Sequence, residues 1–206
     1  MDNPFFARLW TTLSAHEPAA LTALRQENLA GLSGRVLEVG AGTGTNFDYY
    51  PDTVTEVVAV EPETQLAASA RDAAARAAVP VVVREELIED LDPAESFDAV
   101  VCSLVLCSVA SSDGVLQQLY SRLLPGGELR YLEHVATPGA RGALQRVADA
   151  TVWPRLLGNC HTHRRTETAI RAAGFAVQST RRAAALPAWV PLPVTEFALG
   201  RAIKPA

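Results

Sequence analysis

One stretch decides the fold of this chain: Val36-Leu37-Glu38-Val39-Gly40-Ala41-Gly42-Thr43-Gly44. Its apolar first half predicts a buried strand over 35–39. The glycines that follow can adopt positive φ and let the backbone approach a ligand closely. In a parallel sheet, ligands bind beyond the carboxyl ends of the strands, which is where such a turn stands. The stretch therefore predicts both a sheet and a binding loop at its edge.

The rest of the chain alternates strands with helices, which predicts an α/β fold with a mostly parallel sheet and helices on both faces. Pro18 divides the first helix, the turn at 125–127 ends a later one, and Gly174 closes the last. Residues 45–51 are expected to begin a helix, and the final two strands, joined by the proline-rich segment 186–193, to form an antiparallel edge hairpin. Strands are expected at 35–39, 56–61, 79–84, 97–102, 128–135, 175–183 and 195–203, and helices at 3–32, 62–78, 114–124, 141–157 and 164–173.

The composition indicates one well-filled globular domain. The chain has 206 residues, of which 49% are apolar, and this is enough for a single hydrophobic core. We expect one domain over 1–206, in which a helical cover (1–32) precedes the sheet core (33–206). The net charge is -5 at pH 7, and no cluster of Lys and Arg marks a nucleic-acid surface.

The sequence also predicts the compartment. The chain contains no uncharged apolar window of about 18 residues, so we expect no membrane span. The first residues lack the basic and apolar regions of a signal peptide. The three cysteines, Cys102, Cys107 and Cys160, have no paired CxxC spacing, which argues against a disulfide framework and against a structural zinc site. We expect a cytoplasmic protein, favoured as a monomer, whose partner is a small molecule.

The residues around the glycines narrow the ligand. A dinucleotide loop has a third glycine where Thr45 stands here, and no Walker lysine follows the loop. Glu38 would repel a pyrophosphate at the edge of the loop, but it could hold an amino group or a sulfonium-bearing ligand. Glu61 ends the second strand, where a carboxylate can accept both hydroxyls of a ribose. The pattern therefore favours a nucleoside with a cationic substituent over a dinucleotide.

The run 36–44 resembles motif I of the class I S-adenosylmethionine-dependent methyltransferases, and the likeness extends from Val36 to Lys204. This resemblance implies a seven-stranded sheet with a reversed last strand. It also implies a ribose contact at Glu61 and an adenine contact at Glu86, with Glu85 as the rival. Around S-adenosylmethionine, or the product S-adenosylhomocysteine, we expect Glu38, Gly40, Ala41, Gly42, Gly44, Asn46, Glu61, Pro62, Glu86, Leu87, Cys102, Leu104 and Cys107.

A closer resemblance concerns four segments, 46–51, 101–109, 132–136 and 160–164. They are similar to the methyltransferase-like branch that includes thiol S-methyltransferases, and the last segment is similar to its bacterial members. Animal members carry an apolar N-terminal anchor that is absent here, so a microsomal location is not implied. Those relatives often have Asp at the position of Glu61, and Glu should still serve a ribose.

Two histidines are candidates for catalysis. His134 ends the fifth strand at the same edge of the sheet as the glycine loop (residues 40–44), so it could act as base or position the nucleophile. The alternative is a structural histidine bonded to a neighbouring loop. His161, in a loop before a helix, is a substrate-site residue or a solvent-exposed one. A metal site at His161 and His163 lacks a recognised ligand spacing, and we expect no metal.

The remaining candidates line the acceptor side of the site. Cys160 is interpreted as packing or substrate lining, since adjacent residues such as Cys160 and His161 rarely face each other. Cys102 and Cys107 are expected to be small buried hydrophobes. The aromatic residues of the N-terminal segment and of 46–51 either fill the core or form an apolar cover that excludes water. The residues expected to contact the substrate are Phe5, Phe6, Trp10, Tyr49, Cys160 and His163.

These observations predict methyl transfer from S-adenosylmethionine to a small-molecule thiol. The glycine loop and its acids support the transfer reaction, and the resemblance alone supports sulfur as the acceptor. The alternatives are an N-, O- or C-methyltransferase acting on a natural product or a lipid head group, a non-catalytic protein that binds S-adenosylmethionine, and an NAD-dependent oxidoreductase.

Overall fold

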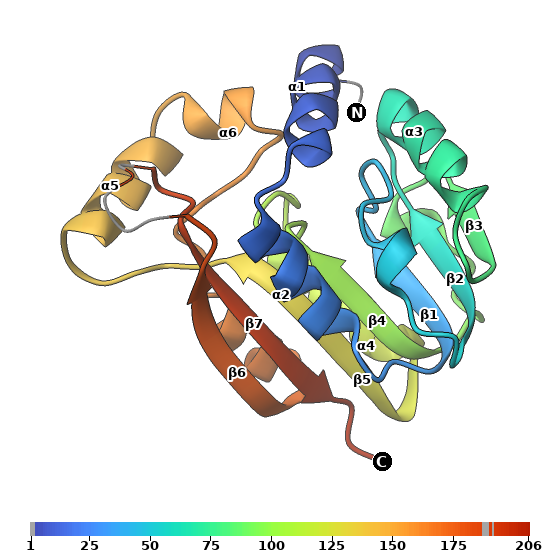
Figure 1. The fold of residues 1–206 in the computed structure, drawn as a ribbon. Helices are drawn as coiled ribbons and strands as arrows, with labels where there is room; N and C mark the ends of the chain where they lie inside the picture. The colour runs from blue at the N-terminus through green and yellow to red at the C-terminus, as the bar shows by residue number, and fades with distance from the viewer. Residues whose placement is uncertain (1–2, 187–189, 191) are drawn as a thin grey trace.

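A mixed sheet forms the centre of the molecule, which a computed structural model describes for residues 3–186, 190 and 192–206. The sheet has seven strands in the order β3-β2-β1-β4-β5-β7-β6 (Figure 1). β7 runs antiparallel to both of its neighbours, and the other pairs are parallel. The strands are β1 Gly34–Val39, β2 Val54–Val60, β3 Val81–Arg84, β4 Phe97–Ser103, β5 Leu123–His134, β6 Ala176–Ala184 and β7 Glu196–Ile203. The expected class I methyltransferase topology, with its edge hairpin, is confirmed.

Helices cover both faces of the sheet because its central strands are apolar on both sides. Leu37 packs in one cluster with Leu116 of α4 and Ile170 of α7. Its neighbour Val36 points the other way and packs with Leu29 of α2. The helices are α1 Pro4–Ala15, α2 Ala19–Leu29, α3 Thr64–Ala74, α4 Ser112–Arg122, α5 Gly139–Asp149, α6 Trp153–Leu156 and α7 Thr166–Ala172, with the 3-10 turns η1 Phe47–Tyr49 and η2 Ile88–Asp90.

The N-terminal helices are separated near Pro18, as predicted. α2 lies across the sheet, whereas α1 stands above its upper edge in Figure 1, between α6 and α3. α1 bonds to the glycine loop through Ser14, whose hydroxyl accepts a hydrogen bond from Thr43 at 3.0 Å. Its other end reaches Gly158, against which the ring of Phe6 packs. The helix thus bridges two loops that are far apart in the sequence.

Two predicted helices differ from the structure. Residues 45–51 form only the single turn η1, because the side chains of Asn46 and Tyr50 are bonded to Glu38 and Pro51 follows. The helix expected over 141–157 is interrupted, and Pro154 stands in the first turn of its second part, α6.

The turn expected at 125–127 belongs to β5. Its backbone pairs with the end of the chain, since Gly126 N–H donates to Lys204 O and Lys204 N–H donates to Gly127 O, both at 2.9 Å.

Part of the proline-rich connection 186–193 lies outside the described residues. Within the described ranges, no helix combines the length and the apolar character that crossing a bilayer requires.

The segment between β3 and β4 is held by Arg122, a 5% exposed residue at the end of α4. Its guanidinium donates to three backbone carbonyls, at 3.2 Å to Ile88, 2.8 Å to Leu91 and 2.6 Å to Asp92. A cation buried with several acceptors is costly to remove, because the acceptors are left without donors. Arg122 therefore fixes the turn η2, which follows directly on Glu86 and Leu87.

We expect Arg122→Met to lower the free energy of unfolding by at least about 2 kcal/mol, because hydrogen bonds to a charged group contribute about 1.5–3 kcal/mol each. Urea unfolding followed by circular dichroism measures the loss. Arg76→Met, at an exposed position, is the matched control and should change the free energy by less than about 0.5 kcal/mol. Equal effects of the two substitutions would contradict a structural role for Arg122.

Candidate functional site

The candidate site lies where the strand order reverses. The chain passes from β1 outward to β2 and β3 and then returns to β4, on the other side of β1. Val39 of β1 pairs with Cys102 of β4, so the two strands end at the same level. Beyond them, Val105 lies so close to Gly40 that a Cβ at position 40 would clash with its side chain. The loops after β1 and β4 are therefore neighbours at the edge where α/β sheets bind ligands.

The glycine loop needs its glycines for two reasons. Gly40, Gly42 and Gly44 have φ angles of 64°, 59° and 80°, a region that L side chains rarely adopt. A Cβ on Gly42 would also lie 2.9 Å from the indole nitrogen of Trp10. The loop is anchored to β2, since the amides of Gly40 and Ala41 donate to Val60 O at 2.9 and 3.1 Å.

Glu61 holds the loop from the end of β2. One carboxylate oxygen accepts the Gly42 N–H at 2.8 Å, and the other accepts the Glu63 N–H at 3.0 Å. Its side chain is buried, and burial raises the pKa of the carboxyl group, whereas the two amide donors lower it. The half-buried Pro62 joins the two acids. Glu61 thus bonds to the glycine loop, and its ribose contact stays a prediction.

Glu38 belongs to a buried polar chain at the end of β1. Its carboxylate accepts hydrogen bonds from the Asn46 amide at 2.9 Å and from the Tyr50 hydroxyl at 2.6 Å. Asn46 in turn accepts from Arg25, which is 3% exposed and donates to Glu17. Burial raises the pKa of Glu38 to about 7, although Tyr50, Asn46 and the charge of Arg25 lower it. These bonds fix the turn that follows the glycine loop.

The two adjacent acids after β3 differ in what they contact. Glu85 accepts hydrogen bonds from Thr64 at 2.7 Å and from Arg71 at 3.0 Å, both on α3. Glu86 has a buried Oε1 without a hydrogen-bond partner among the described residues, and Arg84 is 3.7 Å from it. An unsatisfied buried acceptor favours Glu86 over Glu85 as the ligand-facing acid. The Leu87 amide makes a long contact of 3.4 Å with Asp90.

The loop after β4 contains a strained residue. Leu104 has a φ of 61°, which is unusual for a residue with a branched side chain. Its N–H donates to Leu132 O at 2.8 Å. Cys102, immediately before the loop, is completely buried in the core. Such strain persists only where the surroundings enforce it.

Glu133 holds the loop in this strained conformation. Its role was not identified from the sequence. This 0% exposed residue accepts the N–H groups of Val105, Leu106 and Cys107 at 3.0, 2.9 and 3.2 Å. Burial raises the pKa of its carboxyl group, and the amide donors lower it. The available signal was an acid inside the apolar strand 129–135, because a buried acid must find donors.

Three side chains that the sequence treats separately meet beside this loop. Sγ of Cys160 lies 3.7 Å from Sγ of Cys107 and 3.7 Å from Nδ1 of His134. Cys160 therefore faces His134 rather than its neighbour His161. The ring of His134 also packs on Phe197, with 4.9 Å between ring centroids.

The side chains of the other two candidate histidines are not members of this cluster. His161 contributes its backbone, since its N–H donates to Cys107 O at 2.8 Å. His163 turns toward α5, where its Nε2 is 3.4 Å from Nη1 of Arg146. Its role as a substrate contact stays a prediction.

The predicted aromatic residues divide into two groups. Phe6 and Trp10 stack with 6.0 Å between ring centroids, and together they cover the glycine loop and Gly158. Phe5 is 61% exposed, and Tyr49 packs against the hydrophobic core. Phe6 and Trp10 thus occupy the place expected of an apolar cover.

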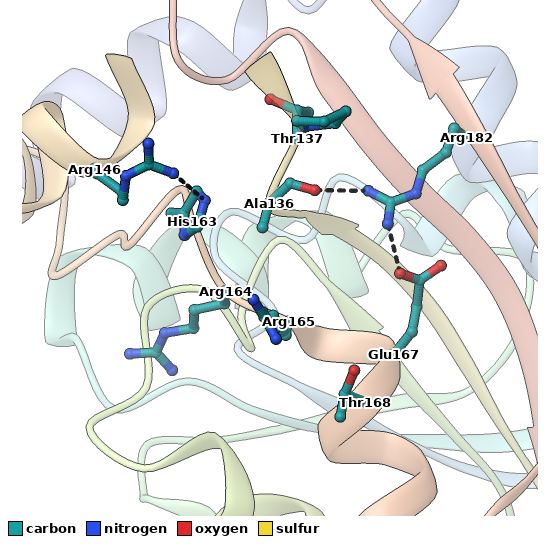
Figure 2. Close-up of a pocket in the computed structure, with 10 residues that line it drawn as sticks. Ala136, Thr137, Arg146, His163, Arg164, Arg165, Glu167, Thr168 and Arg182 are labelled. Carbon is teal, nitrogen blue, oxygen red and sulfur yellow. Dashed lines mark hydrogen bonds and ion pairs between the residues drawn. The ribbon is translucent and has the colours of Figure 1, made fainter. Parts of the chain in front are cut away.

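A cavity of about 410 Å³ is lined in part by His163 and the two arginines that follow it. Figure 2 shows that arginine side chains from several elements surround it, with Arg182 bonded to Glu167 and to Ala136 O. Arg164 turns away from it to hold the carbonyls of Leu106 and Val109, both at 2.7 Å. The residues that line the cavity are Ala136, Thr137, Pro138, Arg146, His163, Arg164, Arg165, Glu167, Thr168 and Arg182.

Comparison with known proteins agrees with this geometry. Residues 13–180 match a family model described as a methyltransferase domain. A thiol S-methyltransferase of Rattus norvegicus is 34% identical over 97% of this chain and 86% of its own. A ubiquinone biosynthesis O-methyltransferase of Xanthomonas axonopodis pv. citri is 31% identical over 65% of this chain and 59% of its own. The N-methyltransferase NodS of Bradyrhizobium japonicum, solved with S-adenosylhomocysteine, superposes with a TM-score of 0.66, 18% identity, and coverage of 100% and 90%.

The raised pKa of Glu38 has a consequence for stability. The folded protein holds this proton up to about pH 7, whereas the unfolded chain loses it near the ordinary glutamate pKa of 4.5. The unfolded state therefore binds fewer protons between these values, and stability falls as the pH rises through this window. We expect Glu38→Gln to lack this fall.

The free energy of unfolding of the variant, minus that of the wild type, should rise by up to roughly 3 kcal/mol between pH 5 and pH 8. Urea titrations at both pH values measure it. A constant loss caused by the Gln amide beside Asn46 does not affect the difference between pH values. Parallel pH profiles would mean that Glu38 is already charged at pH 5.

Proposed function

Because this chain belongs to the class I S-adenosylmethionine-dependent methyltransferases, we propose that it methylates the sulfur of a small-molecule thiol. The family makes the chain an enzyme with S-adenosylmethionine as methyl donor, so the NAD-dependent and non-catalytic alternatives are set aside. The observation that carries the thiol is the 34% identity with a thiol S-methyltransferase over 97% of the chain. The O-methyltransferase matches a smaller part of it.

The residues at the strand ends fit the donor. The positive φ angles at Gly40, Gly42 and Gly44 leave an approach to the backbone that side chains would close. Glu61 presents a carboxylate to the same loop, and Oε1 of Glu86, which has no hydrogen-bond partner among the described residues, provides an acceptor for an amino group. We assign Glu61 to the ribose hydroxyls and Glu86 to the adenine amino group.

The methionine part of the donor is assigned to the loops after β1 and β4. The sulfonium group of S-adenosylmethionine supplies an activated methyl group. Glu38 adds negative charge above about pH 7, which favours a cationic ligand, and it keeps Asn46 in place. The backbone at Leu104 is held in one conformation by Leu132 and by the Glu133 bonds to its neighbours. These groups act by positioning, which is the main requirement of an in-line methyl transfer.

A thiol acceptor suits the apolar surroundings. The thiol of free cysteine has a reference pKa of about 8.5, so a few per cent of such a thiol is already thiolate near neutrality. The chain then needs to exclude water and orient the sulfur atom. We assign the water exclusion to Phe6 and Trp10 of α1, and we place His134 and Cys160 on the acceptor side.

Matched acceptors test the proposal. Thiophenol, phenol and aniline share one ring and differ in the nucleophilic atom, and a panel of alkyl thiols and amines extends the comparison. We expect S-adenosylhomocysteine release and a methyl thioether, detected by mass spectrometry, with kcat/KM for the thiol at least about tenfold above its analogues, which equals about 1.4 kcal/mol in the barrier. Turnover of a phenol or an amine without turnover of any thiol would contradict a sulfur acceptor.

The adjacent acids test the donor site. Glu86→Ala should raise the Kd for S-adenosylhomocysteine, measured by calorimetry, by at least about tenfold, because a hydrogen bond to a charged group contributes about 1.5–3 kcal/mol. Glu85→Ala is the matched control, since the Glu85 carboxylate is bonded to Thr64 and Arg71. Its Kd should stay within about twofold of the wild type. A larger effect at Glu85 would reverse the assignment.

A further inference from the structure

Cys107, His134 and Cys160 form a cluster of metal-ligating side chains beside the proposed donor site. They come from three separate segments: the loop after β4, the last residue of β5 and the loop before α7. Sγ of both cysteines and a ring nitrogen of His134 all lie within 4.8 Å of one another. The cysteines are 1% and 6% exposed and His134 is half-buried, so the two sulfur atoms are shielded from solvent.

The two separations that involve Cys160 match those around one tetrahedral cation, and the third pair lies within 4.8 Å. A Zn–S bond of about 2.3 Å and a Zn–N bond of about 2.0–2.1 Å place neighbouring ligand atoms of a tetrahedron about 3.5–3.8 Å apart. The two separations that involve Cys160 are both 3.7 Å. No rearrangement of these pairs is needed to admit the ion.

The backbone around the cluster is held in place from both sides. Cys107 N–H donates to Glu133 at 3.2 Å, and Cys107 O accepts the His161 N–H at 2.8 Å. The Asn159 amide donates to Ser108 O at 2.7 Å. Residues on both sides of Cys160 are therefore bonded to the segment that carries Cys107. Metal sites depend on such support around their ligands.

We infer that Cys107, His134 and Cys160 bind a thiophilic divalent cation, Zn²⁺ by their chemistry, with three protein ligands. Two sulfur atoms and an imidazole form the donor set that Zn²⁺ prefers over hard cations such as Mg²⁺ and Ca²⁺. Binding releases the two thiol protons to solvent, and two thiolates balance the charge of the ion. The buried site is then electrically neutral, which avoids the cost of an uncompensated charge.

Three protein ligands leave the fourth position of the tetrahedron for a water molecule or another ligand, as in catalytic rather than structural zinc sites. A thiol that coordinates the ion is deprotonated. The role of the fourth position rests on the proposed thiol acceptor. There the acceptor sulfur coordinates the ion and becomes a thiolate. The metal site itself does not depend on the identity of the acceptor.

Cobalt titration of the full chain tests the site. The protein is stripped with a chelator, kept reduced with a phosphine, and titrated with Co²⁺ in the absence of donor and acceptor. We expect one Co²⁺ per chain, a thiolate-to-cobalt charge-transfer band in the near ultraviolet, visible bands of tetrahedral cobalt, and loss of these bands when Zn²⁺ is added. A wild-type spectrum without the charge-transfer band overturns the proposal, whatever the variants do.

Single cysteine variants identify the ligands. Cys107→Ala and Cys160→Ala should each lower the Co²⁺ affinity more than about 100-fold, because even changes behind the ligands cost about 10–100-fold. Cys102→Ala removes the third buried cysteine, which lies outside the cluster, and should retain the affinity within about twofold. Equal affinities in all three variants overturn the assignment, and Cys→Ser versions replace any Ala variant that fails to fold.

Two further outcomes are decisive. A reduced protein that binds no Co²⁺ but loses two thiols on exposure to air would assign the cysteine pair to a disulfide and overturn the metal site. Cobalt binding as described, together with turnover of amines or phenols alone, would leave the metal site standing and remove only the thiol acceptor. The failures of the two proposals are therefore distinguishable.

Discussion

The carboxylate of Glu133 is the contact on which the arrangement of the site depends. It accepts three successive backbone N–H groups, those of Val105, Leu106 and Cys107. This satisfies the donors that a buried loop would otherwise leave without partners. The same bonds keep Leu104 in its strained conformation, hold Val105 against Gly40 and direct Cys107 toward His134. One buried acid thus orients both the loop after β4 and the cluster of Cys107, His134 and Cys160.

Buried acids perform the same task at the other strand ends. Glu61 ties the amide of Gly42 to the end of β2, and Glu38 ties Asn46 and Tyr50 to the end of β1. Each carboxylate loses hydration on burial, which raises its pKa, and regains part of that loss from amide or hydroxyl donors. Ala41, Phe47 and Tyr50 of these loops also pack in the hydrophobic core, so directional bonds to buried acids act together with packing.

Most of the fold and half of the site follow from local sequence patterns. The glycine loop, its strand and Glu61 are contiguous or regularly spaced, so their physical requirements can be read along the chain. The choice between Glu85 and Glu86 needed the structure, since adjacent residues differ only in direction. The cluster of Cys107, His134 and Cys160 could not be predicted, because its members are 53 and 26 residues from Cys160 and are united only by tertiary contacts.

The loop after β4 is held in one conformation by hydrogen-bond partners on opposite sides. Glu133 of β5 accepts hydrogen bonds from its N–H groups, whereas Arg164, just before α7, donates to the carbonyls of Leu106 and Val109. An acid and a cation thus divide the donors and acceptors of a single loop between them. Because Arg164 follows Cys160 by four residues, the bonds that fix the Cys107 loop also limit where Cys160 can lie. The separation of the two sulfur atoms is therefore a consequence of backbone hydrogen bonding, and the chemistry of the cluster depends on residues that make no contact with a ligand.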